Sequence, residues 1–200
     1  MKRVILLAGL LLASCRSPDP SFFTLSAVPG PAQGGAPALV ELRRPGIAGY
    51  LDRSEIVRAN SPYQLHMQSG ERWGEPFGDM VARVLAENLN RRLPGTSVFT
   101  STGAISAEAG ATVELDLQKF DAGPSGQVEL VAQVAVTRGG NRAAAQAQTI
   151  RVAVTPAGNS TTDYVAAMSA ALGQTADRIA AMLRAGSAPA QSRRASRRSH

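Results

Sequence analysis

The sequence predicts an α+β fold: a two-layer sandwich in which two amphipathic helices pack on one face of a mainly antiparallel sheet. Several short segments alternate apolar and polar residues, which is typical of strands with one buried face. Two long segments, Glu75 to Leu93 and Thr162 to Leu183, instead repeat apolar residues at helical spacing. Hydrophobic residues make up 44% of the 200 residues, which is enough for a packed core.

The residues before the first helix predict three strands and a turn. Phe22 to Val28 alternates, and a loop rich in proline and glycine separates it from a second strand at Ala38 to Leu42. Tyr50 to Arg58 reads as a turn that leads into a short apolar stretch. Tyr63 to Gln68 alternates cleanly, which predicts a strand with one face in water.

The first helix has clear signals at both ends. Pro76 suits its first turn, Arg91 and Arg92 suit the negative end of its dipole, and Pro94 with Gly95 stops it. Its apolar stripe consists of Phe77, Met80, Val81, Val84, Leu85, Leu89 and Leu93.

Four further strands are predicted between the helices. They cover Thr96 to Thr100, Thr112 to Gln118, Gln127 to Arg138 and Ala145 to Thr155, with a hairpin turn at residues 139–141 between the last two. Phe120 falls out of phase with the second of these strands, which indicates a β-bulge or strand end near residues 118–119.

The second helix closes the domain. Thr162 can cap it, Asp163 favours its start and Gly186 ends it. We therefore expect a single domain over residues 21–186. Residues 187–200 are Ser, Ala and Arg with one proline and no apolar period, which predicts a disordered tail.

The N-terminus predicts export and lipidation. Residues 1–14 have a basic start and a short apolar run, which is typical of a secretory signal and too short to span a bilayer. Leu12, Ala13, Ser14 and Cys15 resemble the bacterial lipobox. The resemblance implies that Cys15 becomes the first mature residue, carrying diacylglyceryl and N-acyl lipid, with residues 15–20 as a tether. Arg16 stands where aspartate would signal inner-membrane retention, which favours the outer membrane.

The net charge of +6 belongs to the two ends of the chain. The signal carries +2 and residues 184–200 carry +5, so residues 15–183 carry −1. Nucleic-acid binding would rest on the tail alone. In an exported protein we expect the tail's counterions to be lipid headgroups, lipopolysaccharide or anions associated with peptidoglycan, or no specific ligand, and we expect no nucleic-acid partner.

Two sequence blocks in the body resemble one known family. The first is Tyr50-Leu51-Asp52-Arg53 followed by Ile56-Val57-Arg58, and the second is Arg72-Trp73-Gly74-Glu75-Pro76 at a helix start. Together with the lipobox and the element order, they resemble the ABC-type transport auxiliary lipoproteins of the paraquat-inducible protein C type. The resemblance covers roughly residues 12–185, and the Arg-rich tail departs from it.

The resemblance implies a function in lipid transport across the cell envelope. Such a lipoprotein would face the periplasm and act as a docking or assembly subunit beside a mammalian-cell-entry (MCE) domain protein and other transporter subunits, as a homo-oligomer. It would be no enzyme and would need no cofactor beyond its lipid. Two alternatives stay open: a structural lipoprotein for envelope assembly without a transport role, and direct lipid carriage in a hydrophobic cleft.

The two blocks allow two interpretations. In the first, which we favour, Asp52 pairs with Arg53 or Arg58 or caps the turn, and Trp73 packs over the sheet edge. In the second, a partner-binding surface is formed, because Tyr, Trp and Arg are enriched at binding hot spots. Its candidate residues are Tyr50, Leu51, Asp52, Arg53, Arg58, Arg72 and Trp73.

Little in the sequence favours catalysis or metal binding. One cysteine excludes an intramolecular disulfide and a Cys-based zinc site, and His66 falls on the polar face of its predicted strand. Glu114 and Asp116 share one strand face, where solvation is the default and Ca²⁺ stays an alternative. The turn at Gly123 to Gly126 lacks the lysine of a phosphate-binding loop.

Overall fold

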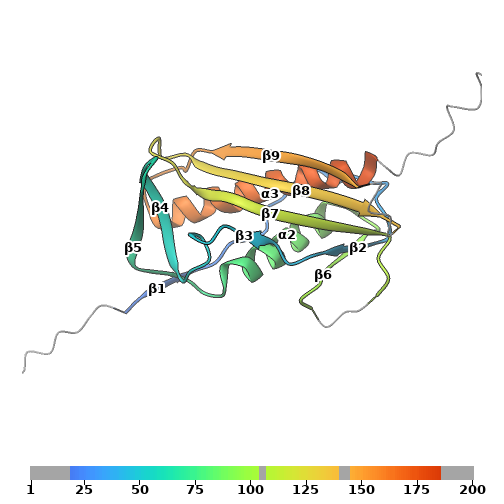
Figure 1. The fold of residues 1–200 in the computed structure, drawn as a ribbon, viewed down its shortest axis with the longest axis horizontal. Coiled ribbons are helices and arrows are strands. Elements are labelled where there is room, and N and C mark those ends of the chain that lie inside the picture. The colour runs from blue at the N-terminus through green and yellow to red at the C-terminus, as the bar shows by residue number, and fades with distance from the viewer. Residues whose placement is uncertain (1–18, 104–106, 140–144, 186–200) are drawn as a thin grey trace, which may run out of the picture.

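The computed structural model describes residues 19–103, 107–139 and 145–185, which form two sheets and two helices (Figure 1). The predicted α+β sandwich is confirmed. The predicted signal peptide with Cys15, most of the hairpin turn at 139–141 and the tail from 187 onward lie outside the described residues.

The large sheet has the strand order β6-β2-β7-β8-β9, and β3 also pairs with β7. The strands β7, β8 and β9 form the predicted antiparallel meander. In contrast, β2 runs parallel to both β6 and β7, and β3 runs parallel to β7. The strands are β2 (Leu39–Leu42), β3 (Gly46–Ile47), β6 (Ser97–Thr100), β7 (Ala111–Ala122), β8 (Val128–Arg138) and β9 (Gln146–Val154).

Antiparallel pairing predominates, as predicted, and β2 and β3 add parallel pairs that the alternation did not predict. Apolar alternation shows which face of a strand is buried, but it carries no information on strand direction. The direction follows from the connections: the chain between β2 and β6 contains a helix, and such a crossover returns parallel to the strand it left.

The predicted bulge in β7 is confirmed. The pairing with β8 shifts between Leu117 and Lys119, so two residues of β7 face one of its partner. The shift turns Phe120 and Ala122 back toward the core, where both are buried.

The small sheet lies at one end of the molecule, with the order β1-β5-β4 (Figure 1). It contains β1 (Ser21–Phe23), β4 (Glu55–Ser61) and β5 (Gln64–Trp73). The predicted first strand, Phe22 to Val28, is too long. The structure ends β1 at Phe23, because the following residues lie on the helices, where no strand is available to pair with them.

Helices α2 (Phe77–Arg92) and α3 (Thr161–Ala185) cover one face of the large sheet, and α3 ends at the far end of the molecule from the small sheet (Figure 1). The cap of α3 differs from the prediction. Ser160, not Thr162, occupies the capping position: its Oγ accepts the Asp163 N–H at 3.1 Å, and the Asp163 carboxylate accepts the Ser160 backbone N–H at 3.3 Å. Such a reciprocal pair is a capping box.

Residues 24–34, called the N-terminal strap here, run from β1 across both helices. Three backbone N–H groups of the strap have no strand to pair with and donate to helix side chains instead. These N–H groups donate from Leu25 to Met80 Sδ (3.2 Å), from Ser26 to Ser169 Oγ (3.1 Å) and from Val28 to Asn88 Oδ1 (3.1 Å).

Within the described ranges, neither helix has the length and apolar character needed to cross a bilayer.

Candidate functional site

The first family-like block forms the turn that precedes β4, and its residues Tyr50 and Leu51 make contacts inside the body. Leu51 is buried, and its N–H donates to the carbonyl of Ala48. Tyr50 is half-buried, and its hydroxyl donates to Asp121 Oδ2 at 2.6 Å. Burial and this hydrogen bond to a carboxylate raise the pKa of Tyr50 above its ordinary value. Tyr50 therefore ties the turn to the bulged end of β7.

The last residue of that block, Arg58, helps to join the small sheet to α3. Its guanidinium lies 4.5 Å from the centre of the Tyr164 ring, a cation–π contact, and its Nη2 donates to Thr161 Oγ1 at 3.0 Å. The Thr161 hydroxyl in turn donates to Glu71 Oε2 on β5 at 2.6 Å. The Thr161 hydroxyl therefore links the Arg58 guanidinium to the Glu71 carboxylate, whose negative charge balances that of Arg58.

Tyr164 is the centre of this junction. Its hydroxyl donates to the carbonyl of Val57 on β4 at 3.0 Å and accepts the N–H of Ala122 on β7 at 3.2 Å. The side chain is 2% exposed, and burial raises the pKa of its phenol. One side chain of α3 therefore connects both sheets.

The second block positions the start of α2. Trp73 is 6% exposed and packs at a tilt against Phe77, with 5.1 Å between ring centres. The backbone N–H of Trp73 donates to the carbonyl of Ser54, and the backbone N–H of Gly74 donates to the carbonyl of Phe23. Because the Trp73 indole is buried, its ring is not accessible to a binding partner. Trp73 therefore fits the first of the two interpretations, in which it packs inside the body.

The remaining candidate residues are exposed. Asp52, Arg53 and Arg72 face solvent on or beside the small sheet, and Arg53 Nη1 contacts Met67 Sδ at 3.0 Å. Partner binding by these three side chains stays a prediction. The structure brings them close to an apolar surface that the sequence reasoning did not single out.

That surface is the outer face of the small sheet. In the described part of the chain, every exposed large apolar side chain lies on this sheet or its turn. The alternation at residues 63–68 predicts a strand with one face in water, but both faces of this part of β5 are exposed. The exposed fractions are 66% for Phe22, 98% for Tyr63, 47% for Leu65 and 48% for Met67.

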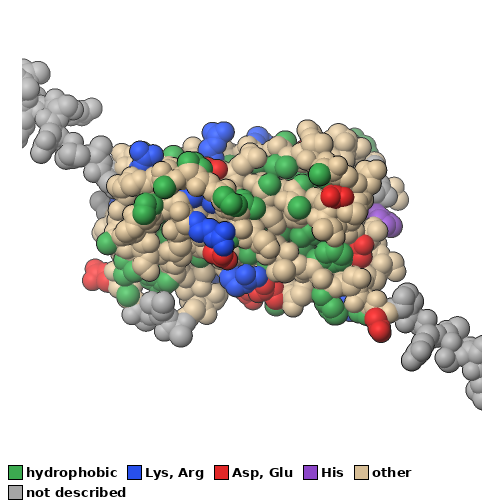
Figure 2. Space-filling view, turned by 180° about the vertical axis from the view of Figure 1, so that it is seen from behind, with side chains coloured by type: hydrophobic (Ala, Val, Ile, Leu, Met, Phe, Trp, Pro, Cys, Tyr) green, Lys and Arg blue, Asp and Glu red, His purple; other side chains and the backbone are tan. Residues whose placement is uncertain are grey.

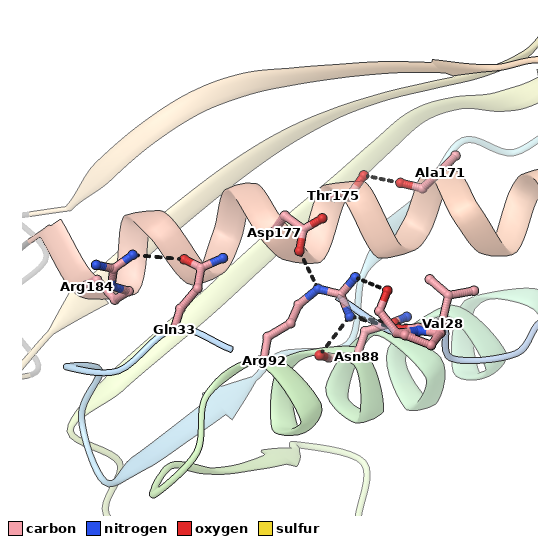
Figure 3. Close-up of polar contacts among 9 residues, drawn as sticks. Val28, Gln33, Asn88, Arg92, Ala171, Thr175, Asp177 and Arg184 are labelled. Carbon is pink, nitrogen blue, oxygen red and sulfur yellow. Dashed lines mark hydrogen bonds and ion pairs between the residues drawn. The ribbon is translucent and has the colours of Figure 1, made fainter. Parts of the chain in front are cut away.

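A buried arginine fixes the N-terminal strap to both helices (Figure 3). Arg92 is 1% exposed, and its Nε donates to Asp177 Oδ1 on α3 at 2.5 Å. Its Nη1 donates to the carbonyl of Val28 at 3.0 Å and to Asn88 Oδ1 at 3.1 Å. The Arg92 carbonyl accepts the N–H of Gln33 at 2.6 Å. We call Arg92, Asp177, Asn88 and Val28 the strap lock.

Close approach at the strap lock requires a glycine. A Cβ placed on Gly173 of α3 would lie 2.2 Å from Val28 Cγ2 and 3.3 Å from Arg92 Nη2. The strap can therefore approach α3 this closely only where α3 carries no side chain.

One feature of the sequence could have indicated this site. Asn88 and Arg92 are spaced four residues apart and continue the apolar stripe of Val81 and Leu85, which places two polar side chains on a buried helix face.

Other charged groups are paired on the surface. Arg43 forms an ion pair with Glu114 at 2.6 Å. Glu114 is one of the two carboxylates that the sequence left open as Ca²⁺ ligands, and here its charge is balanced by an arginine. On α2, Arg91 contacts Glu87 at 2.5 Å. Figure 2 shows basic and acidic side chains beside one another on the side opposite to the view of Figure 1. Within the described residues, no group of three or more His, Cys, Asp or Glu side chains could hold a metal ion.

A shallow groove of about 570 Å³ lies between α2 and β6. Its apolar floor comes from Ala86, Val98 and Phe99, and charged residues of α2, including Arg83 and Glu87, form one rim. It is an open surface feature, whereas the space between the helices and the large sheet is filled by the core.

Comparisons with known proteins agree with this architecture. A family model described as ABC-type transport auxiliary lipoprotein component matches residues 23–180. No curated protein matches the chain. One similar solved structure, of an uncharacterised protein, has 15% identity and a TM-score of 0.69, and the match covers 83% of this chain and 99% of that chain. Another, from Xanthomonas campestris, has 16% identity and a TM-score of 0.65, with 83% and 96% covered. These two likenesses show the shared fold.

Proposed function

The chain belongs to the ABC-type transport auxiliary lipoprotein component family, and from this premise we propose that it is an outer-membrane-anchored periplasmic subunit that docks or assembles an MCE-linked lipid transporter. The family match over residues 23–180 carries the proposal, because it covers nearly all of the described body. The role is a binding role, without catalysis and without a cofactor other than the lipid on Cys15.

The anchor supports the envelope location. The lipobox-like Leu12-Ala13-Ser14 before Cys15 provides the acylation site, and several acyl chains together hold a protein stably on a membrane. Arg16 in place of aspartate supports the outer membrane. An outer-membrane subunit can reach a transporter of the inner membrane only through a partner that crosses the periplasm, and the proposed partner is an MCE-domain protein.

The structure supports a role as a rigid mount for such a partner. Tyr164 joins the two sheets to α3, and Arg92 joins α2 to α3 and fixes the strap that leads from the anchor. A domain with these connections holds its surface in one arrangement, and a preformed surface loses little conformational entropy on binding.

The test is a crosslinking pull-down from native membranes with the full chain. We expect an MCE-domain protein, together with a permease or ATPase, to be recovered with the acylated protein. The matched control is Cys15→Ala, which cannot be acylated and should recover much less. Recovery of envelope-assembly proteins without any transporter subunit would contradict the proposal and favour the structural alternative.

Two paired variants then map the contact. Replacing exposed Arg53 and Arg72 by Ala tests the predicted partner surface, and replacing Arg43 and Arg44, which are also exposed but lie at β2, gives the matched control. Reduced recovery with the first pair alone would place the partner on the small sheet, in competition with a membrane on that face. Equal recovery with both pairs would remove Arg53 and Arg72 from the partner-binding surface.

A further inference from the structure

The outer face of the small sheet has an unusual position relative to the anchor. Its apolar residues are Phe22, Leu65 and Met67, with Tyr63 at the turn. Phe22 belongs to β1, the first element of the body, and β1 lies beside β5 in the same sheet. The exposed apolar surface and the entry point of the lipid-anchored chain are therefore at the same end of the molecule (Figure 1).

Strand pairing shows that these side chains point away from the body. Arg58 and His66 are directly paired, and the Arg58 side chain points toward α3, where it contacts Tyr164 and Thr161. Successive residues of a strand lie on opposite faces, so Leu65 and Met67 lie on the other face.

Phe22 belongs to the same outer face. Phe23 and Trp73 are paired and pack on the core, and the adjacent pair, Phe22 and Arg72, therefore points outward. The pairing of β4 with β5 is irregular between Glu55, which faces Arg72, and Val57, which faces Met67, so Arg72 and Met67 lie on one face although an odd number of residue steps separates them. The face is covered only in part: Val57, which is paired with Met67 on it, is 5% exposed, whereas Leu65 and Met67 are about half exposed.

The tether limits where this face can be. From Cys15 to Ser21 the chain has six residue steps, which span at most about 20 Å when fully extended. A body of this size is roughly 40 Å across, so the tether is shorter than the body. Acyl chains hold Cys15 at the bilayer surface, and the short tether keeps the small sheet near it. At such an effective concentration even a weak contact is well populated.

The chemistry of the face suits a lipid surface. Aromatic rings and long aliphatic side chains favour the interface between headgroups and acyl chains. The charges beside them balance, because Arg53 and Arg72 are accompanied by the acidic residues Asp52 and Glu55. The contact would therefore depend on apolar burial and little on salt.

We propose that the outer face of the small sheet is a second membrane contact, which inserts Tyr63, Leu65, Met67 and Phe22 into the headgroup region of the leaflet that holds the Cys15 lipid. This contact fixes the orientation of the domain, so that the end of α3 points away from the membrane. The inference rests on the anchored role proposed above.

The test uses the full acylated chain in vesicles of phosphatidylethanolamine with a minor share of phosphatidylglycerol. Cys15 is the single cysteine and is blocked by its lipid, so one added cysteine can be labelled selectively. A fluorophore is placed at Tyr63→Cys and, as the matched control, at Ala185→Cys, which is exposed at the end of α3. Nitroxide-labelled lipids quench a fluorophore that lies at the bilayer surface.

We expect at least several-fold stronger quenching at position 63 than at position 185, unchanged by high salt. Adding Leu65→Ser and Met67→Ser to the Tyr63→Cys protein should reduce the quenching toward that of the control. Both substituted side chains are exposed, so circular dichroism should show the fold intact.

Three results would overturn the proposal. Equal quenching at both positions would mean that the domain has no preferred orientation. Stronger quenching at position 185 would assign the membrane contact to the other end. Crosslinking of position 63 to a protein, without quenching, would make this face a protein-docking surface.

The membrane contact and the transport role can fail separately. Recovery of an MCE-domain protein without quenching at position 63 would leave the transport role standing. Quenching without such recovery would leave the membrane contact standing. A chain that is not acylated at Cys15 would not insert into the vesicles, and both proposals would then be wrong.

Discussion

Removing the carboxylate of Asp177 tests the strap lock most directly. Arg92 is 1% exposed, and Asp177, at 31%, supplies the carboxylate that balances its charge. In the Asp177→Ala variant the guanidinium stays buried with neutral acceptors only. Breaking a buried ion pair costs about 3–5 kcal/mol, and because water reaches Asp177 and the acceptors on Val28 and Asn88 remain, we expect about 2–3 kcal/mol.

Urea unfolding with the matched variant Glu87→Ala measures this cost. Glu87 is paired with Arg91 on the same helix as Arg92, but both side chains are nearly half exposed, so its loss should cost about 0.3–0.5 kcal/mol. Asp177→Asn keeps an acceptor without the charge and should fall between the two. In thermal unfolding, Asp177→Ala should lower the Tm by roughly 4–12 °C, at about 2–4 °C per kcal/mol for a domain of this size.

Amide hydrogen exchange separates loss of the lock from general destabilisation. The N–H groups of Val28 and Gln33 are bonded to Asn88 and to the Arg92 carbonyl, so they should exchange faster in Asp177→Ala under conditions where the core of β8 stays protected. If Asp177→Ala costs no more than Glu87→Ala, and the strap amides exchange at their normal rates, the reasoning about a buried, paired guanidinium is refuted.

Two further predictions concern α3. Ser160→Ala removes one half of the capping box with Asp163 and should cost about 1 kcal/mol in urea unfolding, whereas Thr162→Ala should cost less; the reverse order would return the capping role to Thr162. The pKa of Tyr164 is raised in the folded state, so above about pH 10 the unfolded chain loses its phenol proton first, and stability should fall with rising pH by up to about 1.4 kcal/mol per unit. Tyr164→Phe should flatten this dependence between about pH 10 and 11 without abolishing it, because the pKa of Tyr50 is raised too; an unchanged slope would contradict the assignment.

The elements that follow a single local period were predictable from the sequence. The stripe from Phe77 to Leu93 predicted α2 to within two residues at each end, since helical spacing and end signals agree there. The bulge of β7 could be placed at residue 118 because Phe120 breaks the alternation that precedes it. In both cases the information lies in neighbouring residues.

The features that depend on distant residues were not predictable in this way. Phe22 to Val28 alternates like a strand throughout, but only the first part finds a strand to pair with, and the rest pairs with the side chains of Asn88 and Ser169. Arg92 has the sequence position of an ordinary cation in a last helical turn, and it becomes buried only because Asp177 meets it from another helix. Neither the composition nor the spacing of apolar residues shows that residues of two different helices will be in contact.

The family-like blocks illustrate the same limit in the candidate site. Tyr50, Trp73 and Arg58 are residue types enriched at interfaces, yet each is held by contacts inside the body. The exposed apolar surface comes instead from residues 63–67, where alternation alone predicted an ordinary strand. Which face of a strand is covered depends on the layer behind it, and for the small sheet that layer is present only on the side of α3.

The strap lock and the Tyr164 junction connect the N-terminal end to the rest of the domain. β1, the first described strand, is paired with β5, and the strap that follows it is bonded to both helices. The small sheet is itself joined to α3 and β7 through Tyr164. Because β1, the strap, both helices and β7 are joined in this way, a membrane contact made by the small sheet would set the direction of the other surfaces of the domain.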